Sequence, residues 1–423
     1  MSGHRESEPL AGPLAGLRVL DLSRVLAGPW ASQILGDLGA EVFKVEQPGN
    51  GDDTRKWGPP FIENGDGSQD SAYYLCCNRN KHAVAVDLAQ PAGADLIRRL
   101  AASCDILIEN FRVGGLTKYG LDYAAVAAAN PAIIYASITG FGQSGPYKDR
   151  GGYDFLIQGM SGLMSVTGPP EGEGGPTKVG VPISDLTTGI YAAVSILAAL
   201  RHRDRTGEGQ HIDCALFDTQ ICLLANQASN FLNGGAAPRR LGNQHPNVVP
   251  YQDFDAADGR ILVAIGNDRQ YRDFCRLLGD DSLADDPRFQ TNAGRSDHRV
   301  ELVERLRTLV APWSSDELLA AMEAAKLPAG RINDLPTLFS DPQVEARGLV
   351  REFVREDGGT SRVIGYPHRF SRTPPSYRKP PPVIGEDTDR VLMAELGLED
   401  KGLEILRDAG VIASGRKKCG EEA

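Results

Sequence analysis

The feature that most constrains the fold of this chain is the alternation of short apolar strands with helical segments over its first third. Strand-like segments lie at 17–23, 41–46, 82–87, 105–109 and 132–137, with helical patterns between them. Two parallel strands of one sheet need a crossover connection, which is usually a helix. We therefore predict an α/β fold with a Rossmann-like, mainly parallel sheet in the large domain, covered on both faces. Ligands of such sheets bind beyond the carboxyl ends of the strands.

A first βαβ unit is also where a dinucleotide would bind, but the glycine pattern for it is absent. Between Leu22 and Gly39 the glycines fall at 28, 36 and 39, which does not fit GxGxxG, and the chain has no GxxxxGK[ST] segment. We expect no bound nucleotide cofactor. The loops that follow the strands contain instead Arg24, Asn110, Phe111 and the glycines of 140–142.

The length and the changes in composition predict two domains. A chain of 423 residues exceeds the usual size of one core. We expect residues 1–230 to begin the large domain, 231–250, rich in Gly, Pro and Asn, to form a linker, and 251–328 to form a smaller α+β domain with a strand at 261–265. Residues 329–423 then complete the large domain, through a Pro-rich stretch at 373–382, and end in a flexible tail around 416–418.

Charge and apolar patterning exclude several classes of partner. Lys and Arg number 45 and Asp and Glu 56, a net charge of −11 without a long basic stripe, so no nucleic-acid partner is expected. The longest apolar run, 190–200, is shorter than the roughly 20 residues of a membrane span. The N-terminus lacks a signal or transit pattern, so we predict a cytoplasmic protein without a membrane partner. The seven cysteines include an adjacent pair, 76–77, but no CxxC motif, so neither a disulfide framework nor a metal site is expected.

Asp185 is the first candidate functional residue, and its neighbours allow two interpretations. It lies in the segment 180–189, GVPISDLTTG, directly before the most apolar helical run, which we expect to begin at Leu186. Asp commonly caps such a helix, and this is the more frequent role. A carboxylate at a helix N-terminus among small residues is also a place for a nucleophile that the helix dipole keeps ionised.

Motifs along nearly the whole chain carry a resemblance to a known family. They are LAGLRVLDLSR at 14–24, GDDTRKWGPP at 51–60, NRNK at 78–81, ITGFGQSGP at 138–146, VPYQ at 249–252 and GEDTD at 385–389. The chain resembles the family III CoA-transferases, which include formyl-CoA transferase, carnitine CoA-transferase and α-methylacyl-CoA racemase. It looks most like the dicarboxylate branch, of the succinyl-CoA:glutarate type. The resemblance implies subunits that interlock in a homodimer.

The resemblance makes Asp185 the catalytic residue, since the family's aspartate lies in a segment matching 183–189. In the family mechanism this carboxylate attacks the donor thioester, forms a mixed anhydride and then an aspartyl-CoA thioester, and the acceptor acid reverses the steps. Covalent storage of the acyl activation removes any need for ATP, so the CoA thioester is a substrate, and the resemblance implies neither a metal nor a resident cofactor. Gly180 and Gly189 are candidate donors to the tetrahedral oxyanions.

The CoA-binding positions that the resemblance implies are Val25, Asn110, Phe111 and Lys118. Lys118 stands where the family often has arginine, so a point charge replaces a bidentate phosphate clamp. Without the family, Lys118 would be interpreted as a solvated lysine and Phe111 as a core residue. Gln47 stands where some relatives have arginine, which weakens any phosphate contact there.

Two further positions bear on the reaction type and the substrate. Asp154 matches an acid near the active site of transferases, although a carboxylate satisfied within a turn is the alternative. Tyr153 replaces the histidine that moves a proton in the racemase, and a phenol of pKa about 10 cannot readily take that role at neutral pH. Arg24 is a candidate ligand for a distal substrate carboxylate, with a surface ion pair or a CoA phosphate contact as alternatives.

We therefore predict a CoA-transferase that uses an acyl-CoA, such as succinyl-CoA, and a carboxylic acid. A C4 to C6 dicarboxylate is expected as acceptor, with glutarate, itaconate, malate and citramalate left open. Leu26, where formyl-CoA transferase has glutamine, disfavours oxalate and formate. The alternatives are a 2-methylacyl-CoA racemase or epimerase of the same family, and a CoA-ester-binding protein without turnover.

Overall fold

The computed structural model describes residues 12–64, 67–354 and 359–415, which form two compact units. The first unit comprises the chain up to 161, residues 180–223 and the chain from 345 onward, and the second comprises 162–179 and 224–344. These limits differ from the domain limits expected at 230 and 328, and the segment 162–179 belongs to the second unit. The tail expected at 416–418 lies outside the described residues.

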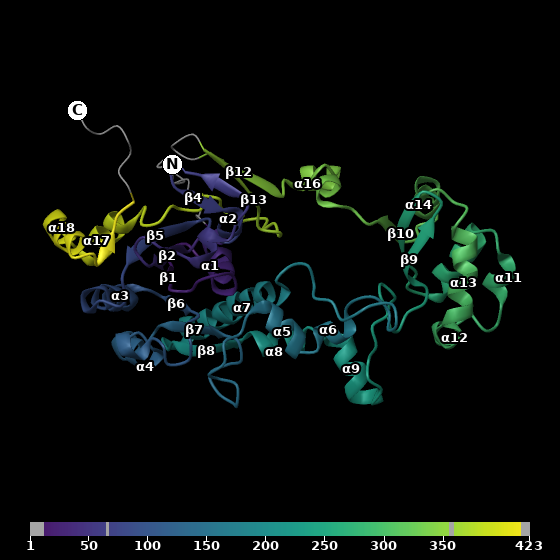
Figure 1. The fold of residues 1–423 in the computed structure, drawn as a ribbon, viewed down its shortest axis with the longest axis horizontal. Coiled ribbons are helices and arrows are strands. Elements are labelled where there is room, and N and C mark those ends of the chain that lie inside the picture. The colour runs from purple at the N-terminus through teal and green to yellow at the C-terminus, as the bar shows by residue number, and fades with distance from the viewer. Residues whose placement is uncertain (1–11, 65–66, 355–358, 416–423) are drawn as a thin grey trace, which may run out of the picture. The chain divides into compact units, whose positions relative to one another are not determined.

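The first unit is built on a seven-stranded sheet in the order β14-β5-β2-β1-β6-β7-β8 (Figure 1). Its strands are β1 (Arg18–Asp21), β2 (Glu41–Glu46), β5 (Lys81–Val86), β6 (Ile106–Glu109), β7 (Ile134–Thr139), β8 (Gln210–Ala215) and β14 (Ile412–Ala413). All neighbouring pairs are parallel except β14 with β5. The predicted α/β class and the mainly parallel sheet are confirmed.

The strand order places a topological switch point between β1 and β6. The chain moves from β1 through β2 to β5 on one side, then returns to β6 and proceeds through β7 to β8 on the other. The connections that leave β1 and β6 at their carboxyl ends therefore diverge, and a crevice opens between them. Backbone hydrogen bonds pair the two strands up to this edge, where the Leu22 amide donates to the Ile108 carbonyl at 2.8 Å.

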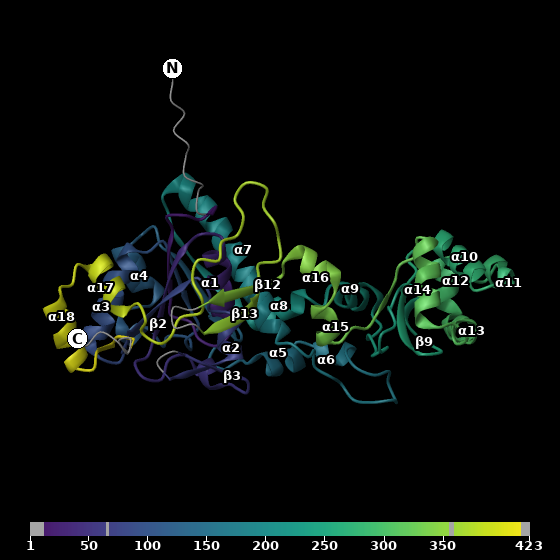
Figure 2. The ribbon, with the colours of Figure 1, turned by 90° about the horizontal axis from the view of Figure 1, so that it is seen from above.

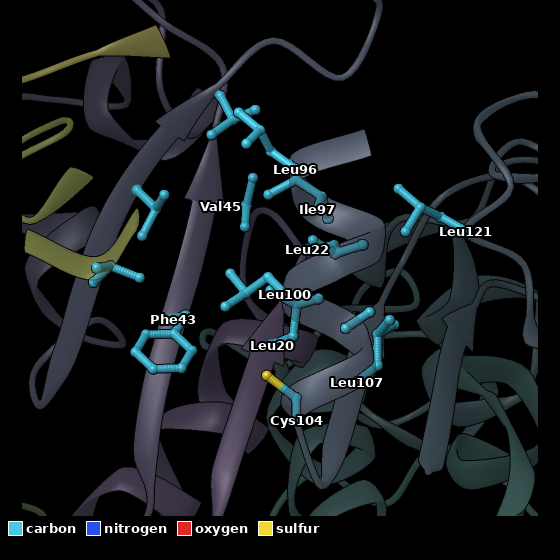
Figure 3. Packing of buried hydrophobic residues seen from close by; sticks show 14 of the residues in the cluster. Leu20, Leu22, Phe43, Val45, Leu96, Ile97, Leu100, Cys104, Leu107 and Leu121 are labelled. Atoms are coloured by element: carbon cyan, nitrogen blue, oxygen red, sulfur yellow. The ribbon is translucent and has the colours of Figure 1, made fainter. Parts of the chain in front are cut away.

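Two apolar cores cover the two faces of this sheet because successive side chains of a strand point to opposite sides. On one face, Leu20 and Phe43 pack with α3 (Pro91–Ser103), α4 (Tyr123–Ala129), α17 (Thr388–Leu396) and α18 (Asp400–Asp408) (Figure 3). Val19 and Val42 pack on the other face with α1 (Ala27–Asp37) and α7 (Ile183–Thr206). Figures 1 and 2 both show α17 beside α3, so the C-terminal part of the chain completes the first core.

Helix α7 is longer than the apolar run in the sequence indicated. It has 24 residues, and its most apolar stretch of 18 residues has a mean hydropathy of 1.6, so by length and composition alone it is long and apolar enough to cross a membrane. Its residues Ala192, Ile196 and Leu200 are instead buried against the central sheet together with α1. We therefore interpret α7 as a core helix of an α/β unit.

The remaining elements of the first unit flank the sheet. They are η1 (Asp53–Lys56), β3 (Phe61–Glu63), β4 (Gln69–Ser71), α2 (Ala72–Leu75), η2 (Thr117–Tyr119), α5 (Asp154–Met160), α8 (Leu216–Cys222), β12 (Val350–Val354) and β13 (Thr360–Ile364). The Pro-rich segment 373–382 runs beside α1. There Asn80 Nδ2 donates to the Ser376 carbonyl at 2.8 Å, and the Arg378 guanidinium donates to the carbonyls of Gly36 and Ala40.

The second unit is a small α+β body with its own core. Its elements are α6 (Leu163–Val166), α9 (Ala225–Gly234), β9 (Tyr251–Ala256), β10 (Gly259–Ala264), α10 (Asp268–Leu277), α11 (Asp281–Asp285), α12 (Asn292–Asp297), α13 (Arg299–Val310), α14 (Ser315–Ala324), β11 (Ala329–Arg331) and α15 (Leu335–Phe339), with α16 (Pro342–Arg347) at its boundary. The three strands form an antiparallel sheet. Arg295 is fully buried and donates to Val249 O, Phe289 O and Asp268 Oδ1. It therefore joins the segment before β9 to the start of α10 and to the loop before α12.

Candidate active site

A cavity of about 750 Å³ lies at the switch point of the large sheet. Its walls are the turn after β1, the loop after β6, the loop after β7 and the first turn of α7. Seven of the predicted site residues line it: Arg24, Val25, Asn110, Phe111, Lys118, Tyr153 and Asp185. The structure thus brings together residues from four separate segments, while Asp154, Gly180 and Gly189 do not line the cavity.

Asp185 is the third residue of α7 rather than its cap. The helix begins at Ile183, three residues earlier than the apolar run indicated, and Pro182 in the N-cap position has no side-chain acceptor. The acceptor comes from α5: Asp154 Oδ1 accepts the Ser184 amide at 2.8 Å, and its Oδ2 accepts Gln158 Nε2 at 2.7 Å. The capping interpretation of Asp185 is therefore wrong, and Asp154 caps α7 from a neighbouring helix.

The charge state of Asp185 also differs from the expectation. The Asp185 side chain is half-buried. Its desolvation, together with the negative charge of Asp154, raises the pKa of Asp185 to about 7. No hydrogen bond to its carboxylate is formed within the described residues. The expected effect of the helix dipole is outweighed because desolvation penalises the anion more strongly than the helix end favours it. Near neutral pH Asp185 is therefore present in both protonation states.

Gly189 and Gly180 occupy positions unlike those expected of oxyanion donors. Gly189 is the seventh residue of α7, so its amide is used by the helix, and it is buried where α7 crosses α1. A Cβ on it would lie 2.6 Å from the Ala27 carbonyl oxygen. Gly180 precedes the helix and is exposed. In the first turn, the amides of Ile183, Ser184 and Leu186 have acceptors, whereas that of Asp185 has none among the described residues.

Gly189→Ala is expected to destabilise the protein by about 1 to 3 kcal/mol, because the added methyl group must push α7 away from backbone atoms of α1. Thermal or urea unfolding measures the change. Gly180→Ala is the matched control, because a Cβ there meets nothing within 4 Å. Equal stabilities of the two variants would contradict the packing role of Gly189.

The Asn110 side chain holds the backbone of Arg24 at the cavity wall. Its amide donates to Asn110 Oδ1 at 2.9 Å, and Asn110 Nδ2 donates to its carbonyl at 2.7 Å. Its guanidinium pairs with Asp53 at 3.0 Å, and both side chains are about half exposed, at 54% and 52%. Arg24 therefore has an acidic partner in the cavity wall. An exposed pair of this kind contributes about 0 to 1 kcal/mol, so Asp53 holds the Arg24 guanidinium only weakly.

The loop after β6 carries Phe111 and Lys118 to the cavity wall. Phe111 packs partly on the apolar core, and its amide donates to the buried carboxylate of Glu109 at 2.8 Å. Burial raises the pKa of Glu109 to about 7. Lys118 is exposed, with its ammonium 4.7 Å from the centre of the Tyr119 ring.

Sequence reasoning missed three further cations in the cavity wall: Arg112, Lys148 and Arg150. With Arg24 and Lys118 they give a local excess of positive charge in a protein of net charge −11. These cations could have been predicted from the sequence, because RVGG at 112–115 and KDR at 148–150 lie in loops that follow strands of a parallel sheet, where ligands bind. Within the described residues, no group of three or more His, Cys, Asp or Glu side chains is arranged to hold a metal.

A cavity at the switch point with a cationic rim and one carboxylate of raised pKa is the site of an enzyme that handles an anionic substrate. The model of the family described as CoA-transferase family III matches residues 14–388. The chain belongs to this family and is a CoA-transferase.

Relatives define the branch of the family more closely. A protein named succinate–glutarate CoA-transferase from Agrobacterium fabrum is 51% identical over 385 residues, which cover 91% of this chain and 96% of that protein. The human succinyl-CoA:glutarate CoA-transferase is 42% identical over 400 residues, 95% of this chain and 90% of that protein. A crystal structure of a CAIB/BAIF family protein from Brucella suis has a TM-score of 0.80 at 46% identity and covers 91% of this chain and 100% of that one. The predicted family and the resemblance to its succinyl-CoA:glutarate type are confirmed.

Proposed function

We propose that this enzyme transfers CoA from succinyl-CoA, or a similar dicarboxylyl-CoA, to a glutarate-like dicarboxylic acid through covalent intermediates on Asp185. The Asp185 carboxylate attacks the thioester carbonyl, which yields an aspartyl acyl anhydride and releases CoA thiolate. The thiolate then attacks the aspartyl carbonyl of the anhydride, which leaves an aspartyl-CoA thioester and frees the donor acid. The acceptor carboxylate repeats the two steps in reverse order, and Asp185 is regenerated.

The observation that carries this proposal is the place of Asp185 in the cavity. Asp185 lines the cavity from the first turn of α7. Burial weakens its solvation, which makes the anion a better nucleophile once it forms. The amide of Asp185 lies at the positive end of the helix and is a candidate donor to the oxyanion of each tetrahedral intermediate. The four other cations of the cavity wall, Arg112, Lys118, Lys148 and Arg150, are candidates for the phosphates of CoA, and Val25, Asn110 and Phe111 are candidates for further contacts with CoA.

Chemical trapping tests this proposal directly. The enzyme is incubated with succinyl-CoA, treated with hydroxylamine or borohydride, digested and analysed by peptide mass. We expect one modified residue, Asp185, and no modification in enzyme incubated with free succinate and CoA. Continued CoA transfer with an unmodified Asp185 would disprove the covalent mechanism.

Arg24 is proposed to bind the distal carboxylate of the acyl group. Arg24→Ala is expected to lower the preference for glutarate over the monocarboxylate butyrate about 10- to 100-fold in kcat/KM, because a charge-assisted pair contributes about 1.5 to 3 kcal/mol. Steady-state kinetics with both acids at fixed succinyl-CoA measures the ratio. Asp53→Asn is the control, since it releases the guanidinium and should leave the preference intact. A loss of CoA affinity with an unchanged preference would assign Arg24 to a CoA phosphate instead.

Tyr153 favours CoA transfer over racemisation. It lies in the cavity wall with 69% of the residue's surface exposed, at a position where a racemase needs a base of near-neutral pKa. We expect no exchange of the α-proton of 2-methylacyl-CoA into solvent deuterium without an acceptor acid.

We also propose a cytoplasmic homodimer. The mutually contacting helices α5, α7 and α8 carry large exposed apolar side chains, namely Phe155, Leu156, Met160, Ile190, Tyr191, Val194 and Ile221. Apolar surface of this extent is typical of an interface.

Val194→Arg is expected to weaken the dimer roughly 100-fold or more, because an unpaired charge buried in an interface costs several kcal/mol. Analytical ultracentrifugation measures the association. Val300→Arg on α13 is the matched control, a change of the same type at an exposed valine of the second unit. A dimer of unchanged strength in Val194→Arg would exclude this helix from the interface.

A further inference from the structure

The turn between β1 and α1 holds a strained residue in the wall of the cavity. Val25 has a φ of +70°, in the left-handed region that β-branched residues rarely adopt. An L-residue other than glycine populates this region about tenfold less than its alternatives. Val25 lines the cavity, so its conformation decides the shape of the wall and the direction in which Arg24 leaves the turn. Something must therefore hold the turn in place.

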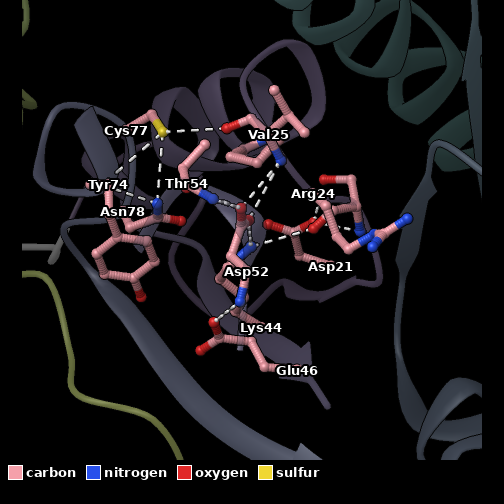
Figure 4. A network of polar contacts seen from close by, with 12 residues as sticks. Asp21, Arg24, Val25, Lys44, Glu46, Asp52, Thr54, Tyr74, Cys77 and Asn78 are labelled. Atoms are coloured by element: carbon pink, nitrogen blue, oxygen red, sulfur yellow. Dashed lines mark hydrogen bonds and ion pairs between the residues drawn. The ribbon is translucent and has the colours of Figure 1, made fainter. Parts of the chain in front are cut away.

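A buried ion pair between Lys44 and Asp52 lies beneath the turn and holds it in place (Figure 4). The Val25 amide lies 3.2 Å from each carboxylate oxygen of Asp52. Lys44 Nζ donates to Asp52 Oδ2 at 2.9 Å and to the Ser23 carbonyl at 3.1 Å. The pair thus binds the backbone on both sides of Arg24. The Asn110 side chain binds the amide and carbonyl of Arg24 itself, so the main chain of the turn is held at consecutive positions.

The pair is itself fixed in position and in charge. Both side chains are completely inaccessible to solvent. Asp52 also accepts the Thr54 amide at 3.0 Å and the Thr54 hydroxyl at 2.7 Å. Burial alone would favour the neutral acid, but Lys44 and the Thr54 donors hold the pKa of Asp52 at about 2. The pair therefore stays ionised near neutral pH, since the neighbouring carboxylates also raise the pKa of Lys44.

We propose that Lys44 and Asp52 are positioning residues for substrate binding, which hold Val25 in its left-handed conformation and so preform the part of the cavity that receives the acyl-CoA. The inference rests on the proposed function of the cavity. Neither side chain reaches the cavity, so they act through Val25 and Arg24 and not on the reacting atoms. Their loss should weaken binding of CoA, because only the fraction of molecules with a formed turn can bind it. The turnover of bound substrate should change little.

The test compares Asp52→Ala in two backgrounds, the natural Val25 and Val25→Gly. Glycine adopts positive φ about as readily as negative φ, so it needs much less help to form the turn. With the natural valine, we expect Asp52→Ala to raise the Kd of CoA and the KM of succinyl-CoA about tenfold, with kcat within about threefold of its starting value. In the Val25→Gly background, we expect the same substitution to raise both only about twofold. Calorimetry with CoA measures Kd, and steady-state kinetics with succinyl-CoA and glutarate measures KM and kcat. Each is measured with and without Asp52→Ala in both backgrounds.

The outcomes separate this inference from other roles. An equal effect of Asp52→Ala in both backgrounds would overturn it, because a general loss of stability or a direct CoA contact does not depend on the residue at the strained position. A fall in kcat at unchanged KM would also overturn it. If Asp52→Ala leaves Lys44 unpaired and the protein unfolded, Lys44→Met with Asp52→Leu removes both charges and is compared in the same two backgrounds. Failure of the unsubstituted enzyme to bind CoA would contradict the proposed function instead.

Discussion

Asp185→Asn is expected to lower the rate of CoA transfer roughly 10⁴-fold or more, the range found when a covalent nucleophile is removed from an enzyme. The amide cannot form the acyl anhydride, so no modified peptide should be trapped after incubation with succinyl-CoA. Rapid-quench and steady-state assays with succinyl-CoA and glutarate measure the loss. Transfer within about tenfold of the natural enzyme would exclude Asp185 as the nucleophile.

The same substitution should stabilise the unliganded protein at pH 8, which separates catalysis from folding. The pKa of Asp185 is about 7 in the folded protein and near 3.8 in a free aspartate. The folded state therefore keeps a proton that the unfolded state loses, and stability falls as the pH rises from about 4 to about 7. Above pH 7 the buried anion carries this penalty in full, whereas asparagine carries none. We expect a higher melting temperature for Asp185→Asn at pH 8 and a smaller difference at pH 5.

Asp154→Asn is the matched control for the trapping measurement. Asparagine keeps an oxygen that can accept the Ser184 amide, so the start of α7 is preserved while one charge near Asp185 is removed. We expect it to retain covalent trapping on Asp185. A loss of trapping equal to that in Asp185→Asn would show that a general disturbance of this helix end, and not the nucleophile, explains both results.

The parts of the fold that follow from local patterns could be predicted from the sequence. The strand at Glu41–Glu46 was expected at the same residues, because an apolar run between a glycine and a proline is a local signal. The edge of the sheet that carries the cavity followed from the alternation of strands and helices, since ligands of parallel sheets bind beyond the carboxyl ends of the strands. These inferences need only the period of the side chains and the handedness of crossovers.

The features that depend on contacts between distant segments could not be predicted. Helix α7 begins at Ile183 because its cap is supplied by Asp154, 30 residues away in the chain. Gly189 was expected to donate to an oxyanion, but a single sequence does not tell which turn of a helix faces a ligand and which faces another helix. The pairing of Lys44 and Asp52 beneath Val25 likewise depends on the register of β1 and β2.

The pH dependence of transfer should report the raised pKa of Asp185. Only the carboxylate attacks, so kcat/KM for succinyl-CoA should fall about tenfold for each pH unit below 7, or about 100-fold at pH 5. Part of the raised pKa comes from the charge of Asp154, and Asp154→Asn should therefore move this acidic limb to lower pH. Ionisation of the substrates is identical for the two proteins, so the difference between their profiles reports the enzyme alone. An acidic limb that does not move in Asp154→Asn would show that desolvation by itself sets the pKa of Asp185. Activity independent of pH down to 5 would contradict the raised pKa.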